Sequence, residues 1–151
     1  MKRFLRQENN SKIKVVIDTN VVISAPLGKD TKPARIFELL ILEKIDNYTS
    51  KEILDEVKRV FESPKISSLI SEEKKDFIIH NFKAFSNAIR PEIRLDVIKE
   101  DKADNKFLEC ALAAKASYII SGDKHLLRLR KFQDVSIVSP KEFLGILGDE
   151  D

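Results

Sequence analysis

The sequence has one cysteine, two histidines and no tryptophan among its 151 residues. A single cysteine, Cys110, cannot form an internal disulfide, so the chain fits a reducing compartment. His80 and His125 are isolated from each other and from Cys110, and no His/Cys group has the spacing of a zinc site. These absences exclude a disulfide-stabilised secreted domain and a structural zinc centre. We expect Cys110 to fill space in the core and His125 to lack a catalytic partner.

Long apolar runs are also missing. No stretch approaches the roughly 20 apolar residues that a membrane-spanning helix needs. The first residues, MKRFLRQENNSK, are basic but contain no apolar segment of the kind that a signal peptide requires. The sequence therefore predicts a soluble, cytoplasmic protein with no membrane association.

Neither sign of charge predominates, because 27 Lys and Arg residues oppose 25 Asp and Glu residues and leave a net charge of +2. This balance does not by itself indicate a nucleic-acid partner. Hydrophobic residues make up 42% and charged residues 34%, which is a globular composition. We predict a single domain over residues 12–148, with flexible tails at 1–11 and 149–151.

Apolar patterns predict strands that alternate with helices. Strands are expected at 13–17, 46–49, 118–120 and 135–138. Helices are expected around 34–41, after Ser50, after Ser71, over 104–115 and after Ser139. This alternation predicts an α/β fold, a three-layer α/β/α sandwich with a central parallel sheet. Ligands of such sheets bind at the carboxyl ends of the strands, so polar residues there are candidates for a site.

Two acidic residues directly follow predicted strands. Asp18 ends the strand at 13–17, and Asp123 ends the strand at 118–120 within Ser121-Gly122-Asp123. An aspartate in this position can also open a turn or cap a helix. Because the carboxyl ends of parallel strands meet at one edge, we expect the two carboxylates to share a site.

A third acid, Asp104, opens the predicted helix at 104–115. The apolar residues Phe107, Leu108 and Ala111 lie three, four and seven positions later, which places Asp104 on the buried face of that helix. The alternative is a simple N-cap, and capping is compatible with binding a metal. We assign Asp101, one helical turn earlier, to the preceding loop.

The helix after Ser50 offers three acids. At about 100° per residue, Glu56 lies roughly 40° outside Val60, at the rim of the apolar face. Glu52 lies further out on the same side, and Asp55 faces solvent. Glu56 is therefore the better candidate for a site, although an ordinary surface ion pair remains an alternative.

Several carboxylates in one cleft repel one another unless cations or protons compensate them. Mg²⁺ and Mn²⁺ prefer such oxygen ligands, and one or two ions would fit four acids. A metal with open coordination positions can bind a phosphodiester and activate water. Metal-assisted phosphodiester hydrolysis is thus the chemistry that these residues predict.

Three motifs together resemble the PIN-domain family: IDTN at 17–20, the helix carrying Glu56, and DNKFLECALAAKASYIISGD at 104–123. The resemblance runs from about residue 13 to residue 147. It implies a Mg²⁺- or Mn²⁺-dependent nuclease that acts on RNA, and in prokaryotes often the toxin of a toxin–antitoxin pair. It implies four metal-ligating acids and two supporting polar residues: Asp18, Glu56, Asp104 and Asp123, with Asn20 and Ser121.

The resemblance also implies partners. RNA and an antitoxin protein are expected, and a homodimer is open, because Phe77, Ile78, Phe82 and Phe85 could form either core or interface. Basic residues close to the acids in sequence could contact RNA phosphates, or could simply form a solvated surface. These residues are Lys124, Arg128, Arg130 and Lys131 after Asp123, and Lys29, Lys32 and Arg35 after Asp18.

Two other functions remain as alternatives. A haloacid-dehalogenase-like phosphatase also places an aspartate after its first strand, but it needs a second aspartate where this chain has Asn20. A catalytically inactive PIN fold could serve as an RNA- or protein-binding module. The intact set of acids argues against this second alternative.

Overall fold

The computed structural model describes residues 12–148, so the expected tails at 1–11 and 149–151 lie outside the described residues. Its sheet has six strands in the order β3-β2-β1-β4-β6-β5. All neighbouring pairs are parallel except β5 and β6, which are antiparallel. The strands are β1 (Lys14–Ile17), β2 (Asp46–Thr49), β3 (Ser86–Ala88), β4 (Tyr118–Ile120), β5 (Lys131–Phe132) and β6 (Val135–Val138).

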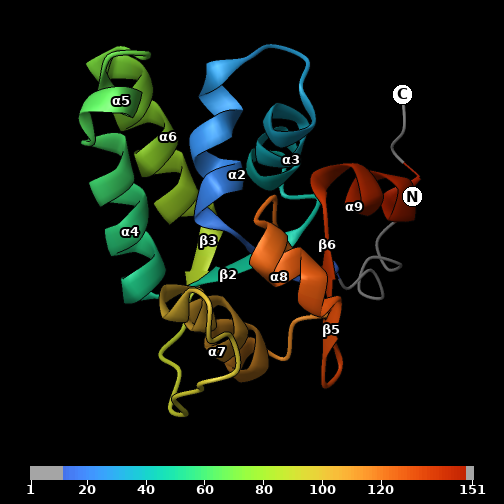
Figure 1. The fold of residues 1–151 in the computed structure, drawn as a ribbon. Helices are drawn as coiled ribbons and strands as arrows, with labels where there is room; N and C mark the ends of the chain where they lie inside the picture. The colour runs from blue at the N-terminus through green and yellow to red at the C-terminus, as the bar shows by residue number, and fades with distance from the viewer. Residues whose placement is uncertain (1–11, 149–151) are drawn as a thin grey trace.

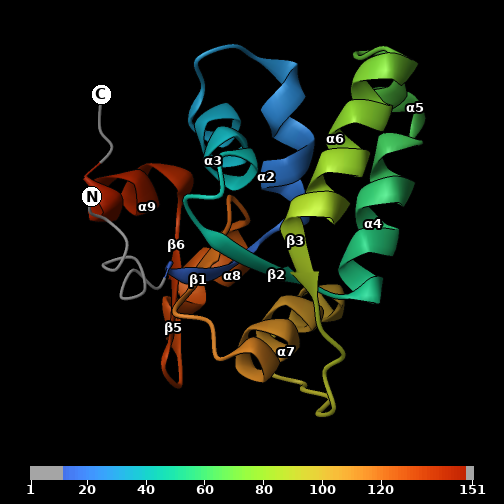
Figure 2. The same cartoon turned by 180° about the vertical axis from the view of Figure 1, so that it is seen from behind.

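Helices lie on both sides of this sheet. They are α2 (Thr19–Ser24), α3 (Lys32–Ile41), α4 (Lys51–Phe61), α5 (Pro64–Ser67), α6 (Glu72–Phe85), α7 (Asn105–Ala114), α8 (Lys124–Leu129) and α9 (Pro140–Leu147), with 3-10 turns η1 (Ala25–Leu27) and η2 (Lys102–Asp104). In Figures 1 and 2, α7 lies below the sheet, whereas α2 and α3 lie above it. The predicted α/β/α sandwich is confirmed, and its sheet is parallel, as predicted, except for the antiparallel pair β5 and β6.

Local sequence sets most of the helix starts. Ser50, Ser71 and Ser139 each accept a hydrogen bond from a backbone N–H in the first turn of α4, α6 and α9, which satisfies a group that would otherwise lack a partner. Pro140 follows Ser139 at the first helical position, where its missing N–H does no harm. These capping residues are the local signal from which the sequence predicts the starts of α4, α6 and α9.

The middle of the sheet forms the core. Val15 and Val16 of β1 are fully buried, and Ile119 and Ile120 of β4 pack beside them without exposure. Cys110 of α7 is also fully buried, as expected, and burial raises the pKa of its thiol to about 12. The core therefore fixes β1 and β4 as neighbours, and with them the residues that follow these strands.

Some elements differ from the sequence predictions. The sequence reading missed α2, α5, β3 and the antiparallel edge strand β5. Helix α2 reads TNVVIS, and its two valines and isoleucine favour strands locally, so its helical form depends on tertiary packing. Phe77 was expected on the apolar side of α6, but its side chain is 55% exposed, whereas Ile78 and Phe82 are buried. The buried face of α6 includes the Lys75 side chain instead.

Within residues 12–148, none of the helices has the length and apolar character needed to cross a membrane.

Candidate metal-binding active site

Asp18 lies where β1 ends, against the end of β4. Its backbone N–H donates to the Ile120 carbonyl at 2.9 Å, so the two strand ends are directly joined. The side chain is only 3% exposed, and its Oδ1 accepts a hydrogen bond from the Asn20 backbone N–H at 3.4 Å. Asp18 is thus a buried carboxylate at the expected edge of the sheet and also caps α2.

Ser121 connects the two strand-end acids. Its Oγ donates to Asp18 Oδ2 at 2.6 Å and accepts from the Asp123 backbone N–H at 2.9 Å. Asp123 Oδ1 in turn accepts from the backbone N–H groups of His125 and Leu126 at 2.7 and 3.3 Å. Asp123 therefore caps α8 with one carboxylate oxygen, while Asp18 and Asp123 are linked through a single hydroxyl.

Asp104 ends η2 and stands at the N-cap position of α7. Its side chain makes no capping hydrogen bond, so the simple N-cap alternative is wrong. Asp104 is 7% exposed, and its Oδ2 is buried with no hydrogen-bond partner among residues 12–148. A buried acceptor without a protein partner is unfavourable, so Asp104 Oδ2 is a candidate ligand atom for a cation.

The structure separates Glu56 from Glu52. Glu56 Oε1 accepts from Thr19 Oγ1 at 2.6 Å and lies 3.2 Å from Lys106 Nζ. Glu52 instead forms an ion pair with Arg94 at 2.8 Å, and both of these side chains are well exposed. Glu56 therefore faces the other acids, whereas Glu52 belongs to the outer surface.

Electrostatic interactions join these groups into one site. The pKa of Asp18 is raised from 3.8 to about 6, first by burial and further by the charges of Asp123 and Glu56, while hydrogen bonds from Ser121 and Asn20 oppose the rise. Burial of a carboxylate disfavours its charged form, and neighbouring negative charges act in the same direction.

Asp104 behaves in the same way. Its pKa is raised from 3.8 to about 7, first by burial and then by the charges of Asp123, Asp101 and Asp18, whereas Lys106 lowers it. The charges of Asp18 and Asp123 therefore act on Asp104, whereas Glu56 acts on Asp18. Asp101 also acts on Asp104.

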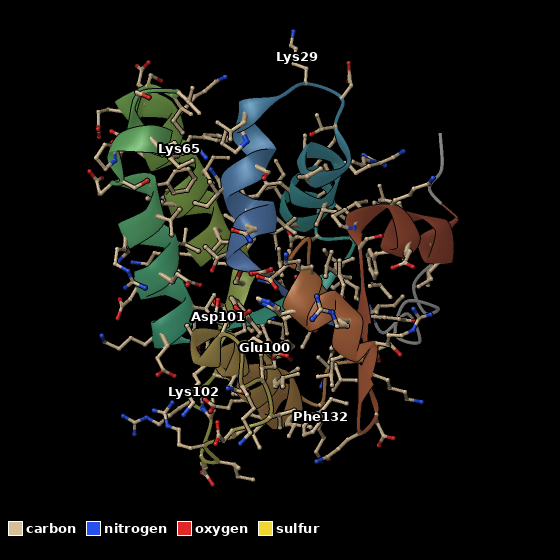
Figure 3. The ribbon with its side chains drawn as sticks, viewed as in Figure 1. Lys29, Lys65, Glu100, Asp101, Lys102 and Phe132 are labelled. Atoms are coloured by element: carbon tan, nitrogen blue, oxygen red, sulfur yellow. The ribbon has the colours of Figure 1, made fainter. Side chains whose placement is uncertain are left out.

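Four residues of the site were missed or discounted in the sequence reading. Asp101 caps η2 at the end of the expected loop, and its carboxylate also joins a cluster with Asp104, Asp123 and His125. His125, expected to lack a catalytic partner, contributes a ring nitrogen to that cluster. Figure 3 shows Asp101 where the start of α7 faces α8.

The other two missed residues, Thr19 and Lys106, both contact Glu56. Lys106 is only 10% exposed, and its Nζ also donates to the Ala103 carbonyl at 2.6 Å. The signal that could have indicated Thr19 is its place inside IDTN, directly after the first acid. Lys106 had no such signal, because it lies on the opposite side from Asp104 in a regular helix.

The structure also places Asn20 and the basic residues that the sequence analysis named as possible RNA contacts. Asn20 is exposed and supplies only its backbone N–H to Asp18, and Arg35 pairs with Glu38 on α3. Lys29 projects from the loop between η1 and α3, far from Asp101 in Figure 3. Four exposed basic residues follow Asp123 in sequence, on α8 and directly after it: Lys124, Arg128, Arg130 and Lys131.

The donor set fits a divalent cation of the Mg²⁺ or Mn²⁺ kind. Such ions take carboxylate oxygens as ligands, and Asp104 Oδ2 lacks any other partner among the described residues. A bound ion would also compensate the negative charges that raise the pKa values of Asp18 and Asp104. Of the four acids predicted from sequence, Asp104 and Asp123 belong to the cluster of possible ligand atoms found among the described residues, and Asp18 and Glu56 do not.

Comparison with known proteins gives the family of this chain. The family model for the PIN domain matches residues 14–125, which include all four acids. The chain is a PIN domain. The match ends within α8, so the final strands and α9 lie beyond it.

An uncharacterized protein of Methanocaldococcus jannaschii is 40% identical to this PIN domain over 142 residues, which cover 88% of this chain and 90% of that protein. Among solved structures, VapBC2 from Rickettsia felis, bound to a DNA fragment from its promoter, matches with a TM-score of 0.55 at 14% identity and covers 83% of this chain and 97% of that one. The PIN domain of T. brucei RRP44 matches with a TM-score of 0.50 at 12% identity, over 91% of this chain and 82% of that one. At these identities the structures indicate a shared fold.

Proposed function

We propose that this PIN domain is a divalent-metal-dependent ribonuclease that hydrolyses RNA phosphodiester bonds. The observation that carries the proposal is the buried, unpartnered Oδ2 of Asp104 beside the carboxylate of Asp123. Asp18 is connected to Asp123 through the Ser121 hydroxyl, and the charge of Glu56 acts on Asp18. A purely structural cluster would be expected to satisfy its buried acceptors with protein donors.

Each acid has a distinct role in this proposal. Asp104 and Asp123 hold the ion, and Asp18 is kept in a fixed orientation by the Ser121 hydroxyl. Glu56 is fixed by Thr19 and Lys106 on the other side of the site. When bound, Mg²⁺ or Mn²⁺ would lower the pKa of a water molecule and stabilise the leaving oxygen.

RNA is the proposed substrate, and the exposed residues Lys124, Arg128 and Arg130 are proposed to contact its phosphates. Lys124 and Arg128 belong to α8, the helix that Asp123 caps, so they lie on the element next to the acids. Contacts of this kind position a nucleic-acid strand without reading its sequence.

The test is cleavage of a labelled single-stranded RNA by purified protein with Mg²⁺, Mn²⁺, Ca²⁺ or chelator. We expect cleavage with Mg²⁺ or Mn²⁺, little with Ca²⁺ because of its looser coordination, and none in chelator. Asp104→Asn, purified identically, controls for contaminating nucleases and should be inactive. Undiminished cleavage in chelator, or by the Asp104→Asn variant, would contradict the proposal.

The same preparation separates the two alternatives. Hydrolysis of p-nitrophenyl phosphate without RNA cleavage would favour a phosphatase, although Asn20 occupies the place of the acid that such an enzyme needs. RNA binding without cleavage under all metal conditions would favour an inactive binding module. A DNA strand of the same sequence tests whether the preference is for RNA.

We further propose that the domain acts as the toxin of a toxin–antitoxin pair in the cytoplasm. The family resemblance supports this role, and the similarity of fold to VapBC2 agrees with it. Induced expression in a bacterial host should arrest growth, and the Asp104→Asn variant should not. Equal growth with both proteins would contradict a toxin role while leaving ribonuclease activity open. The homodimer stays a prediction, to be checked by light scattering.

A further inference from the structure

We propose that His125 and Asp101 join Asp104 and Asp123 as ligands of the divalent ion, so that the site has mixed nitrogen and oxygen donors and prefers Mn²⁺ over Mg²⁺. The inference rests on the proposed function, because both place an ion at Asp104 and Asp123. It adds two ligands that neither the family model nor the sequence pattern assigns.

The geometry of the four side chains is the first argument. Each offers one ligand atom, and these atoms all lie within 4.8 Å of one another. An octahedral ion with bonds of about 2.1 Å places adjacent donors about 3 Å apart and opposite donors about 4.2 Å apart. The four atoms are therefore close enough for side-chain torsions to bring them around one ion.

Two unpartnered buried atoms are the second and independent argument. Asp104, which is 7% exposed, has its Oδ2 buried without a partner, and His125 has its Nδ1 buried without a hydrogen bond within residues 12–148. His125 Nδ1 lies 3.8 Å from Asp123 Oδ1, which is too long for a hydrogen bond. A cation shared by these groups would satisfy both unpartnered atoms at once.

The surrounding contacts hold the ligands in place. The His125 backbone N–H donates to Asp123 Oδ1 at 2.7 Å, so the two residues are fixed to each other at the start of α8. The loop that carries Asp101 is attached to α7 by Asn105, whose Oδ1 accepts from the backbone N–H groups of Val97 and Ile98 at 3.0 and 2.9 Å. Backbone hydrogen bonds at α8 therefore hold Asp123 and His125, and those of Asn105 hold the loop that precedes Asp101.

An imidazole ligand changes which metal is favoured. Mg²⁺ strongly prefers oxygen donors, whereas first-row transition metals such as Mn²⁺ accept imidazole nitrogen together with carboxylates. We expect the wild-type protein to bind Mn²⁺ at least about tenfold more tightly than Mg²⁺. Removing the ring nitrogen should reduce Mn²⁺ affinity by about tenfold or more, and Mg²⁺ affinity much less.

The decisive experiment uses the chain's low histidine content. Mn²⁺ is added to the purified protein, and pulsed electron paramagnetic resonance detects any nitrogen nucleus coupled to the ion. His125→Phe keeps the ring volume and removes the nitrogens, while His80→Phe changes the exposed histidine on α6 as a matched control. Calorimetric titration of each protein with Mn²⁺ and with Mg²⁺ gives the affinities.

We expect nitrogen coupling in the wild-type protein and in His80→Phe, and its loss in His125→Phe. Labelling the His80→Phe protein with ¹⁵N-histidine should change the coupling, which gives a result even if His125→Phe does not fold. Asp101→Asn should weaken Mn²⁺ binding as well.

Bound Mn²⁺ without nitrogen coupling, or equal losses of Mn²⁺ and Mg²⁺ affinity in His125→Phe, would overturn the inference and leave the ribonuclease proposal standing. Nitrogen coupling in a protein that cleaves no RNA would support the metal site and overturn the ribonuclease instead. Failure to bind Mn²⁺ at all would overturn the inference directly.

Discussion

Ser121 and Asp18 are 103 positions apart in sequence, yet the Ser121 hydroxyl donates to Asp18 Oδ2 at 2.6 Å. This bond spans the ends of β1 and β4, the two strands at the centre of the sheet. Because both residues are almost fully buried, the bond orients the Asp18 carboxylate with little competition from water.

Replacing this hydroxyl provides the first prediction. Ser121→Ala should lower the rate of RNA cleavage by roughly 10- to 100-fold, as the loss of a supporting hydrogen bond to a metal ligand typically does. Ser121→Thr keeps the hydroxyl and should restore most of the rate. Ser136→Ala, on β6, is the matched control and should cleave RNA at the wild-type rate. Equal activity of Ser121→Ala and wild type would show that the bond has no catalytic importance.

The choice between two glutamates of α4 gives the second prediction. Glu56→Gln should reduce cleavage at least about 100-fold, because this carboxylate faces the other acids. Glu52→Gln should stay within about twofold of wild type, since Glu52 only pairs with exposed Arg94 and such pairs contribute little. Single-turnover cleavage measures both. The reverse order of effects would place the active site elsewhere on α4.

Lys106 gives the third prediction, because it is a largely buried cation next to Glu56. Lys106→Met removes that charge and should destabilise the metal-free protein by roughly 1–3 kcal/mol, as expected for leaving a partly buried carboxylate unpaired. Adding Glu56→Gln to Lys106→Met should recover part of the loss. Urea denaturation of the four proteins in a double-mutant cycle measures the interaction, and simple additivity would show that the pair is not coupled.

The stability of the metal-free protein should depend on pH. The pKa of Asp18 is raised from 3.8 to about 6 and that of Asp104 from 3.8 to about 7. Between pH 4 and pH 7 the folded protein therefore binds more protons than the unfolded chain, so the free energy of unfolding falls as pH rises. Each unit of raised pKa corresponds to about 1.4 kcal/mol, so a fall of a few kcal/mol is expected by pH 8.

Urea denaturation in chelator at pH 5 and pH 8 checks this dependence. Asp104→Asn should flatten the profile, and Mn²⁺ should stabilise the wild-type protein more at pH 8 than at pH 5. A free energy of unfolding that rises between pH 5 and pH 8 in chelator would contradict the buried, mutually repelling acids that the structure shows.

The basic residues of α8 give the fifth prediction. In the Asp104→Asn background, which should prevent cleavage, replacing Lys124 and Arg128 with alanine should weaken RNA binding. The slope of log affinity against log salt should decrease by about 0.7 for each lost phosphate contact. Lys29→Ala is the control and should leave the slope unchanged, because Lys29 lies far from Asp101 in Figure 3. Equal effects at both places would indicate non-specific attraction.

The position of Lys106 relative to Asp104 could not be predicted from the sequence. In a continuous α-helix they would lie about 200° apart. Asp104 instead ends the 3-10 turn η2, and α7 begins only at Asn105, so the helical phase changes between them. The Lys106 ammonium lies 2.6 Å from the Ala103 carbonyl and 3.2 Å from Glu56 Oε1. Helical periodicity read from the sequence assumes a constant phase and could not reveal this.

By itself, the sequence determined the strands at the centre of the sheet, the capped helix starts, and the acids at the ends of β1 and β4. Those features depend on neighbours within a few residues, through side-chain alternation, capping hydrogen bonds and the burial of apolar runs. Only the tertiary structure decided that Glu56 rather than Glu52 faces the acids, that Ser121 reaches Asp18, and that Asp101 and His125 approach Asp104. Most of these contacts join residues that are far apart in sequence. They depend on the order of strands in the sheet and on the positions of loops, which no local sequence pattern encodes.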